Sequence, residues 1–201
     1  MLDGPWLPLL SGNVCIGSNN PSLLSVFPTS LAYSRMASRF PPFAKDTPRY
    51  HKTKYIAILI WNQSTSYDFP TAQFAEKAGM DMILVGDSMG MCVYGYAGGT
   101  MPVTMDQCIV HSEAVRRGAP NTFVIGDMPF LSYQTTPADA VRNAGRFLKK
   151  AGVDAIKLEG GRRIGTMIRA IVDAGMVVCG HIGLTPQSSG QIGGFKAQGR
   201  T

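Results

Sequence analysis

Residues 82–90 read Met-Ile-Leu-Val-Gly-Asp-Ser-Met-Gly, and the rest of the chain is best understood outward from them. Their four opening apolar residues predict a strand covered on both faces, because a run without alternation suits a buried parallel sheet. Asp87 and Ser88 follow directly after the strand and Gly86. The carboxyl ends of parallel strands are where α/β folds keep their chemistry, so these polar residues are candidates for a site. Taken alone, they are better interpreted as caps of the next segment.

Strands and helices are predicted to alternate on both sides of this stretch. The predicted strands are residues 55–60, 82–85, 122–125, 155–158 and 176–179, and the predicted helices are residues 70–78, 104–117, 137–150 and 163–173. Alternation at this spacing is typical of right-handed βαβ units that build a parallel sheet. The sequence therefore predicts an α/β fold.

Composition narrows the classes of function. The 201-residue chain has room for one sizeable domain, and 45% hydrophobic residues is ordinary for a globular protein. The net charge of +6 comes from scattered basic pairs without interleaved aromatic residues, so nucleic-acid binding is not expected. Cys15, Cys92, Cys108 and Cys179 lack metal-type spacing and are predicted to be reduced. No apolar run approaches the roughly 20 residues of a membrane span, and no membrane partner is expected.

Residues 1–50 differ from the remainder and are predicted to form a disordered N-terminal extension. They are rich in Ser and Pro, and Asp3 and Asp46 are their only acidic residues. An acid-poor, Arg-bearing segment of this kind favours a mitochondrial transit peptide. The alternatives are a tail without an address, which would leave the protein cytoplasmic, and an internal start at Met36.

Acidic residues follow three successive predicted strands. They are Asp87, Asp127 and Glu159, separated by about one βα unit each. Because the carboxyl ends of parallel strands meet at one rim, these carboxylates are expected to converge there. Unpaired, they would repel one another and raise one another's pKa, and a bound divalent cation resolves that conflict. Oxygen ligands without thiolate favour a hard ion, most simply Mg²⁺.

Basic and imidazole side chains occupy the same predicted rim. Lys157 and Glu159 share strand parity, so both can point toward the interior of the sheet. Lys157 could neutralise a substrate oxygen, or it could form a structural salt bridge to Asp127 or Glu159. His181 follows the fifth predicted strand and is a further candidate.

Six motifs give the sequence a resemblance to a known family. They are residues 85–90 (Val-Gly-Asp-Ser-Met-Gly), 101–104 (Met-Pro-Val-Thr), 114–119 (Ala-Val-Arg-Arg-Gly-Ala), 127–130 (Asp-Met-Pro-Phe), 157–161 (Lys-Leu-Glu-Gly-Gly) and 179–187 (Cys-Gly-His-Ile-Gly-Leu-Thr-Pro-Gln). In this order they resemble ketopantoate hydroxymethyltransferase (3-methyl-2-oxobutanoate hydroxymethyltransferase), from about Tyr55 onward. The resemblance implies a (β/α)8 TIM barrel of the phosphoenolpyruvate/pyruvate superfamily. Residues 51–201 would be a partial barrel that holds about the first five βα units.

The resemblance also implies a reaction and a set of site residues. A hydroxymethyl group would pass from 5,10-methylenetetrahydrofolate to 3-methyl-2-oxobutanoate, giving 2-dehydropantoate for pantothenate and coenzyme A synthesis. Carried over by motif, Asp87, Asp127 and Glu159 would hold Mg²⁺ directly or through water. The residues that would contact the 2-oxo acid are Asp87, Ser88, Asp127, Lys157 and His181. Full-length members of the family are expected to be homo-oligomers.

Two features depart from the family pattern. Residues 61–66 add polar residues after the first predicted strand, which predicts a longer loop or an artefact of splicing or gene modelling. The chain ends at Thr201, whereas the family's general-base glutamate is expected beyond that point, so the chain alone is expected to be inactive. The alternatives are a carbon–carbon lyase or phosphoenolpyruvate mutase activity within the superfamily, and a non-catalytic fragment that associates with full-length subunits.

Overall fold

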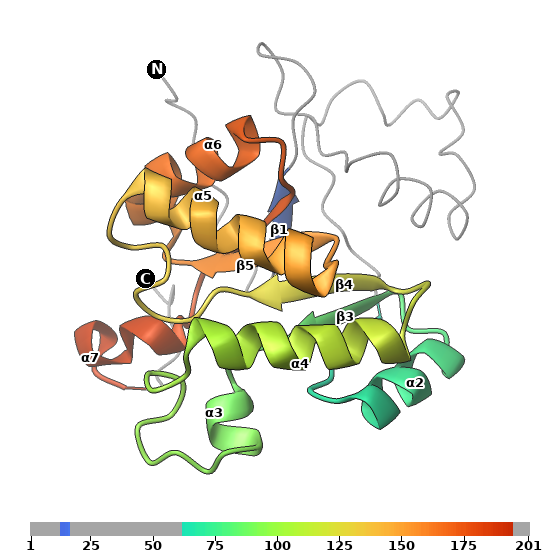
Figure 1. Cartoon of the computed structure of the whole chain (residues 1–201). Helices are drawn as coiled ribbons and strands as arrows, with labels where there is room; N and C mark the ends of the chain where they lie inside the picture. The colour runs from blue at the N-terminus through green and yellow to red at the C-terminus, as the bar shows by residue number, and fades with distance from the viewer. Residues whose placement is uncertain (1–12, 17–61, 195–201) are drawn as a thin grey trace, which may run out of the picture.

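The computed structural model describes residues 13–16 and 62–194. Its sheet has the order β1-β6-β5-β4-β3-β2 (Figure 1). The strands are β1 (Asn13–Ile16), β2 (Gln63–Thr65), β3 (Met82–Val85), β4 (Phe123–Asp127), β5 (Ala155–Glu159) and β6 (Val178–His181). Strands β2 to β6 are parallel to their neighbours, and β1 pairs antiparallel with β6. The predicted parallel sheet of five βα units is confirmed.

Helices connect the parallel strands, and α4 and α5 lie side by side in front of the sheet in Figure 1. The α-helices are α2 (Phe69–Lys77), α3 (Met89–Cys92), α4 (Met105–Gly118), α5 (Pro137–Arg146), α6 (Gly165–Asp173) and α7 (Ser189–Ile192). A π-helix, η1 (Phe147–Ala151), continues α5, and the 3-10 helices η2 (Gly161–Ile164) and η3 (Pro186–Ser188) follow β5 and β6.

The long helices begin where side chains can bind their free backbone N–H groups. The Asp68 carboxylate caps α2, and the Thr136 hydroxyl caps α5. Thr104 and Gln107 form a reciprocal capping box at the start of α4. Such caps satisfy N–H groups that have no partner within the helix, so these starts are fixed locally by the sequence.

The sheet has two distinct apolar faces. Side chains such as Ile83, Val124 and Ile156 belong to the large core that includes the helices. Their neighbours in sequence, such as Ile125 and Ala155, belong to a second, smaller cluster. Because side chains alternate across a strand, Asp127, Lys157 and Glu159 share the face of this second cluster. These three candidates therefore lie on the sheet face opposite the helices.

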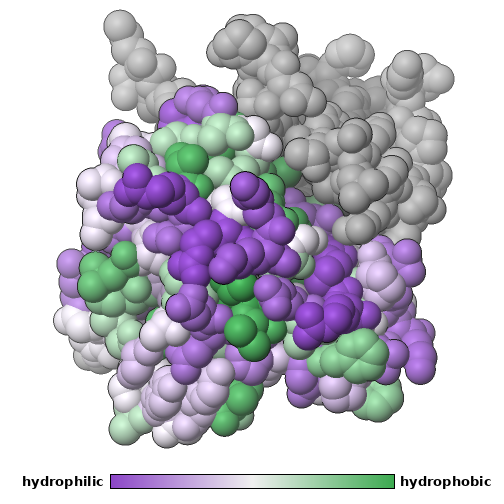
Figure 2. Space-filling model, viewed as in Figure 1, coloured by the Kyte–Doolittle hydropathy of each residue, from purple (hydrophilic) through white to green (hydrophobic). Residues whose placement is uncertain are grey.

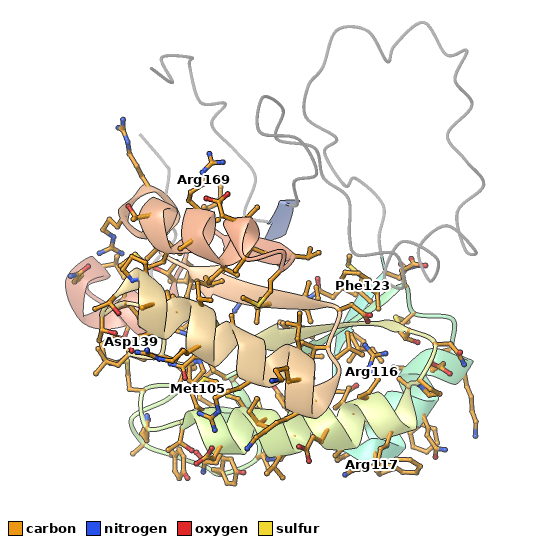
Figure 3. All side chains as sticks on the ribbon, turned by 45° about the horizontal axis from the view of Figure 1, so that its top comes forward. Met105, Arg116, Arg117, Phe123, Asp139 and Arg169 are labelled. Carbon is orange, nitrogen blue, oxygen red and sulfur yellow. The ribbon has the colours of Figure 1, made fainter. Side chains whose placement is uncertain are left out.

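The amino end of the sheet is tied together by structural contacts. Arg116 near the end of α4 donates to the carbonyls of Gly152 and Thr122, each at 2.9 Å, and pairs with the Asp154 carboxylate. Figure 3 shows Arg116 near Phe123, at the end of the molecule away from the helix starts. The candidate site occupies the other end, at the strands' carboxyl termini.

The strand predicted at residues 55–60 lies outside the described residues, but the loop predicted at residues 61–66 was wrong. Residues 63–65 of that stretch form β2, with Gln63 aligned to Met82 and Thr65 aligned to Leu84 of β3. The strand is short, polar and paired on one side only, as edge strands often are. It carried no hydrophobic alternation that could reveal it. A short strand thus takes the place of the predicted longer loop, and the alternative of a splicing or gene-modelling artefact stays a prediction.

Smaller differences concern element ends. The helix predicted over residues 137–150 closes with the π-helical turn η1, and the strand predicted at residues 176–179 is shifted to Val178–His181. Residues 13–16, within the predicted N-terminal extension, form β1 against β6. The remainder of the 1–50 segment lies outside the described residues.

The helix-bearing face is largely polar. Figure 2 shows hydrophilic residues across much of this face, with apolar residues in smaller separate patches. Within the described part of the chain, no helix is long and apolar enough to cross a membrane.

Candidate active site

Three carboxylates and one ammonium group are buried together at the carboxyl end of the sheet. Asp87 follows β3, Asp127 ends β4, and Lys157 and Glu159 lie in β5. Each retains 5% or less of its exposed surface, and no other Asp, Glu, Lys or Arg in the described ranges is buried so fully. Burying a charge is costly unless it is paired. The arrangement therefore points to a site, because a fold that needed only stability would place apolar residues there.

Lys157 lies among the carboxylates. Its Nζ donates to Asp127 Oδ2 at 2.6 Å and lies 3.7 Å from Glu159 Oε1. The predicted shared parity of Lys157 and Glu159 agrees with these contacts. The alternative role for Lys157 was a structural salt bridge to Asp127 or Glu159, and the structure contains both ion pairs. They do not exclude a ligand role, because one ammonium cannot balance three carboxylates.

Asp127 is only half satisfied. Its Oδ2 accepts from Lys157 Nζ and, at 3.2 Å, from the backbone N–H of Asp87. Its Oδ1 is buried and has no hydrogen-bond partner among the described residues. A buried carboxylate oxygen without a donor loses its hydration without compensation, so such atoms demand an explanation. A ligand that carries positive charge or a donor would satisfy it.

The pKa values of Asp87 and Lys157 are both raised within the site. Burial and the neighbouring Asp127 carboxylate raise the pKa of Asp87 to about 8, although Lys157 and the Gln187 amide partly oppose them. For Lys157, burial lowers the pKa, but the charges of Asp127, Glu159 and Asp87 outweigh burial and raise it to about 12. The site thus has too little positive charge for its three carboxylates, and the raised pKa of Asp87 is the result.

The residues present fit a hard divalent cation. Within the described residues, no three Asp, Glu, His or Cys side chains stand close enough to form a ready metal cluster. Yet the donors are all carboxylate oxygens, the set would carry two more negative than positive charges with all three acids ionised, and Asp127 Oδ1 lacks a partner among the described residues. Oxygen-rich, acidic surroundings suit Mg²⁺, which needs only one or two protein carboxylates and completes its shell with water or substrate.

Ser88 borders the same site from the end of β3. Its Oγ lies 2.8 Å from the Tyr67 hydroxyl, and the two exchange a hydrogen bond. A Cβ on Gly86 would lie 2.7 Å from Ser88 Oγ, so the absence of a side chain at Gly86 leaves room for the hydroxyl in this position. Burial, ahead of the other influences, raises the pKa of Tyr67.

His181 ends β6 beside Glu159. Its Nδ1 lies 3.7 Å from Glu159 Oε1, is buried, and has no hydrogen-bond partner among the described residues. The side chain as a whole is 23% exposed, so its ring reaches from the buried carboxylates toward the surface. The structure thus brings all six predicted site residues to one rim, with Ser88 and His181 at its border.

Sequence reasoning missed two residues that hold this rim together. Gln187, in η3, contacts both Asp87 and Glu159, and the Tyr133 hydroxyl contacts Gln187 and the Glu159 backbone. Gln187 stands in one of the quoted motifs, which was the available signal. Tyr133 lies in an irregular segment after β4, where no periodicity marks it.

Comparison with known proteins identifies the family of the chain. The family described as Ketopantoate hydroxymethyltransferase matches residues 49–201. A 3-methyl-2-oxobutanoate hydroxymethyltransferase of Alkaliphilus metalliredigens is 74% identical over 136 residues, which cover 68% of this chain and 48% of the relative. The same-named protein of Moorella thermoacetica is 58% identical over 137 residues, 68% of this chain and 51% of its own. The chain therefore spans about half the length of the curated relatives it matches.

Solved structures with a similar course of the chain come from other enzymes. A 2,3-dimethylmalate lyase, described as a PEP mutase/isocitrate lyase superfamily member, gives a TM-score of 0.46 at 24% identity, covering 57% of this chain and 43% of its own. A phosphonopyruvate hydrolase complex with oxalate and Mg²⁺ gives 0.46 at 16% identity, with the same two coverages. From the family match over three quarters of its residues, the chain belongs to the ketopantoate hydroxymethyltransferase family.

Proposed function

We propose that this chain carries the part of a 3-methyl-2-oxobutanoate hydroxymethyltransferase that binds the 2-oxo acid and Mg²⁺. The full reaction would transfer a hydroxymethyl group from 5,10-methylenetetrahydrofolate to 3-methyl-2-oxobutanoate, yielding 2-dehydropantoate. Family membership supports the reaction class. The observation that carries the site is the group of three buried carboxylates around one ammonium, with Asp127 Oδ1 unpartnered.

Asp87 and Asp127 would hold the cation, with Glu159 acting directly or through water. When bound, Mg²⁺ would supply Lewis-acid polarisation of the keto group. It would also supply the positive charge that the buried carboxylates lack, and so favour the ionised form of Asp87. Affinity for the metal should therefore be linked to proton release from the site.

The remaining residues of the site would hold the organic acid. Lys157 offers an ammonium to a substrate oxygen, and its raised pKa keeps it charged at any physiological pH. Ser88 offers a hydroxyl from the rim, and His181 offers a ring nitrogen that has no hydrogen bond within the described residues. An anionic substrate with adjacent carboxylate and ketone oxygens matches this combination of a cationic centre and hydrogen-bond donors.

Titration calorimetry with 3-methyl-2-oxobutanoate tests the proposal. We expect binding to the 201-residue chain in the presence of Mg²⁺ and at least a tenfold loss of affinity in EDTA. Asp127→Asn and Lys157→Met should each lose binding, whereas Asp173→Asn, at an exposed position of α6, should not. Equal binding with and without Mg²⁺, or unchanged binding by Asp127→Asn, would refute the assignment. Phosphonopyruvate serves as the competitor that a mutase-type site would prefer.

A further inference from the structure

Gln187 lies where it can control two of the proposed cation ligands at once. It belongs to η3, beyond β6, and its side chain is buried. Its Nε2 donates to Asp87 Oδ2 at 2.8 Å, and its backbone N–H donates to Glu159 Oε2 at 3.1 Å. Asp87 and Glu159 come from β3 and β5, which are separated in the sheet by β4. One residue thus joins the carboxylates on either side of Asp127.

The amide of Gln187 can adopt only one orientation. Its Nε2 faces two acceptors, the Asp87 carboxylate and the Met128 carbonyl at 2.9 Å. Its Oε1 faces the Tyr133 hydroxyl at 2.7 Å and Gln134 Nε2 at 3.1 Å. Both donor hydrogens of the amide are therefore matched by acceptors, and Gln134 Nε2 donates to its oxygen. The single Tyr133 hydroxyl proton is shared between Gln187 Oε1 and the Glu159 carbonyl. Flipping the amide would set its oxygen against two acceptors, which fixes the Nε2 toward Asp87.

Tyr133 is the second part of this arrangement. Its hydroxyl lies 2.8 Å from the Glu159 carbonyl and accepts from the Glu159 N–H at 3.1 Å, so it also grips the strand that carries Glu159. Burial raises the pKa of Tyr133, so the hydroxyl keeps its proton and remains a donor. Tyr133, held by the backbone of β5, therefore orients the Gln187 amide, and the amide in turn donates to Asp87.

We propose that Gln187 is a positioning residue for the divalent cation: with Tyr133, it fixes one oxygen of Asp87 and one of Glu159 and directs both carboxylates toward the metal. The inference rests on the proposed function, because it concerns ligands of the proposed Mg²⁺ site. Outer partners that orient metal-binding carboxylates are worth about 10–100-fold in metal affinity. A purely structural glutamine would instead change stability and leave that affinity alone.

Mn²⁺ binding to the 201-residue chain tests the inference, measured from the electron paramagnetic resonance signal of the free ion. Gln187→Met keeps the side chain's length and removes its donors and acceptor. We expect its dissociation constant for Mn²⁺ to rise by about tenfold or more. Tyr133→Phe removes only the hydroxyl that sets the amide direction, and we expect a smaller rise. Gln191→Met, in the exposed part of α7, is the matched control and should bind Mn²⁺ like the wild type.

Thermal unfolding with and without Mn²⁺ separates positioning from structure. A ligand that binds only the folded protein raises its melting temperature according to its affinity. We expect the Mn²⁺-induced rise to shrink in Gln187→Met and to be retained in Gln191→Met. A variant that melts lower by the same amount with and without Mn²⁺, with an unchanged dissociation constant, would overturn the inference.

The outcomes also distinguish this inference from the proposed function. Wild-type protein that fails to bind Mn²⁺ would overturn the metal site itself and the inference with it. Wild-type binding that is matched by both Gln187→Met and Tyr133→Phe would overturn the inference alone. If Gln187→Met does not fold, Tyr133→Phe provides the test. Unchanged Mn²⁺ affinity in that variant would contradict the proposed positioning of the Gln187 amide by Tyr133.

Discussion

Lys157 Nζ lies 2.6 Å from Asp127 Oδ2 and 3.7 Å from Glu159 Oε1, so a single buried ammonium serves two buried carboxylates. Removing one partner of such a group leaves uncompensated charge in the interior, which costs about 3–5 kcal/mol. In Mg²⁺-free buffer we therefore expect Lys157→Met to lower the free energy of unfolding by about that amount. Urea denaturation provides the measurement.

Excess Mg²⁺ should restore part of the loss, because the cation supplies the missing positive charge. The exposed Lys150→Met, in η1, is the control and should change stability little. A Lys157→Met protein that is as stable as the wild type without any divalent cation would contradict this account of the buried charges.

The pKa of Asp87 predicts how stability depends on pH in EDTA. The folded protein keeps a proton on Asp87 up to about pH 8. The unfolded chain releases that proton near pH 3.9. Between these values the folded state binds more protons, so this group makes the free energy of unfolding fall as pH rises. Asp87→Asn should flatten the dependence of the free energy of unfolding on pH. Identical slopes for the two proteins would show that burial does not raise the pKa of Asp87.

Gly126 in β4 predicts an effect on core packing. A Cβ at this position would lie 2.5 Å from Phe147 Cδ1 and 2.8 Å from Cε1. Because Phe147 is fully buried, Gly126→Ala should be destabilising by about 1–3 kcal/mol. Gly145→Ala, in α5, has nothing within 4 Å of its new methyl and should stabilise the protein. Denaturant midpoints that move in the same direction for both variants would count against this packing argument.

Proton exchange at C3 of 3-methyl-2-oxobutanoate reports on the base. A general base needs a free lone pair within hydrogen-bond reach of the proton that it removes. At the described rim, the three carboxylates would be committed to the cation, whose charge lowers their basicity, and Lys157 and Gln187 also bind them. We therefore expect that the 201-residue chain catalyses negligible exchange of the C3 proton with ²H₂O. Proton NMR of the 2-oxo acid measures this exchange.

Rapid exchange would contradict that expectation and direct attention to His181, whose Nδ1 has no hydrogen bond within the described residues. Loss of that exchange in His181→Asn, with retention in His111→Asn, would then identify the base. His111 is a suitable comparison because it is partly buried and contacts the Tyr67 carbonyl and the Tyr94 hydroxyl rather than a carboxylate of the site.

Local chemistry explains which parts of the fold could be predicted from sequence. The strand Met82–Val85 was predicted with its observed ends, because four apolar residues are bounded by Asp81 and Gly86. The starts of α4 and α5 follow from Thr104 and Pro137, which act within one turn of the helix. β2 could not be found, because Gln63–Thr65 is polar and becomes a strand only by pairing with β3.

The same distinction applies to the site. Asp87, Asp127 and Glu159 follow apolar runs, so the topology of parallel strands brings them to one rim without knowledge of any contact. Gln187 and Tyr133 reach the carboxylates from irregular segments between or beyond the strands. Their role depends on tertiary contacts across the sheet, and no local pattern of residues encodes it.

The antiparallel pairing of β1 with β6 has a consequence for the order of folding. It joins residues 13–16 to residues 178–181, the most widely separated strand pair in the described sheet. Closing so long a loop costs more chain entropy than closing any βα unit, so the parallel units should form first and β1 should add to a finished edge. Amides shared by β1 and β6 should accordingly exchange with solvent sooner than those between β3 and β4. Detachment of β1 would expose the edge of β6 while the neighbouring strands remain paired.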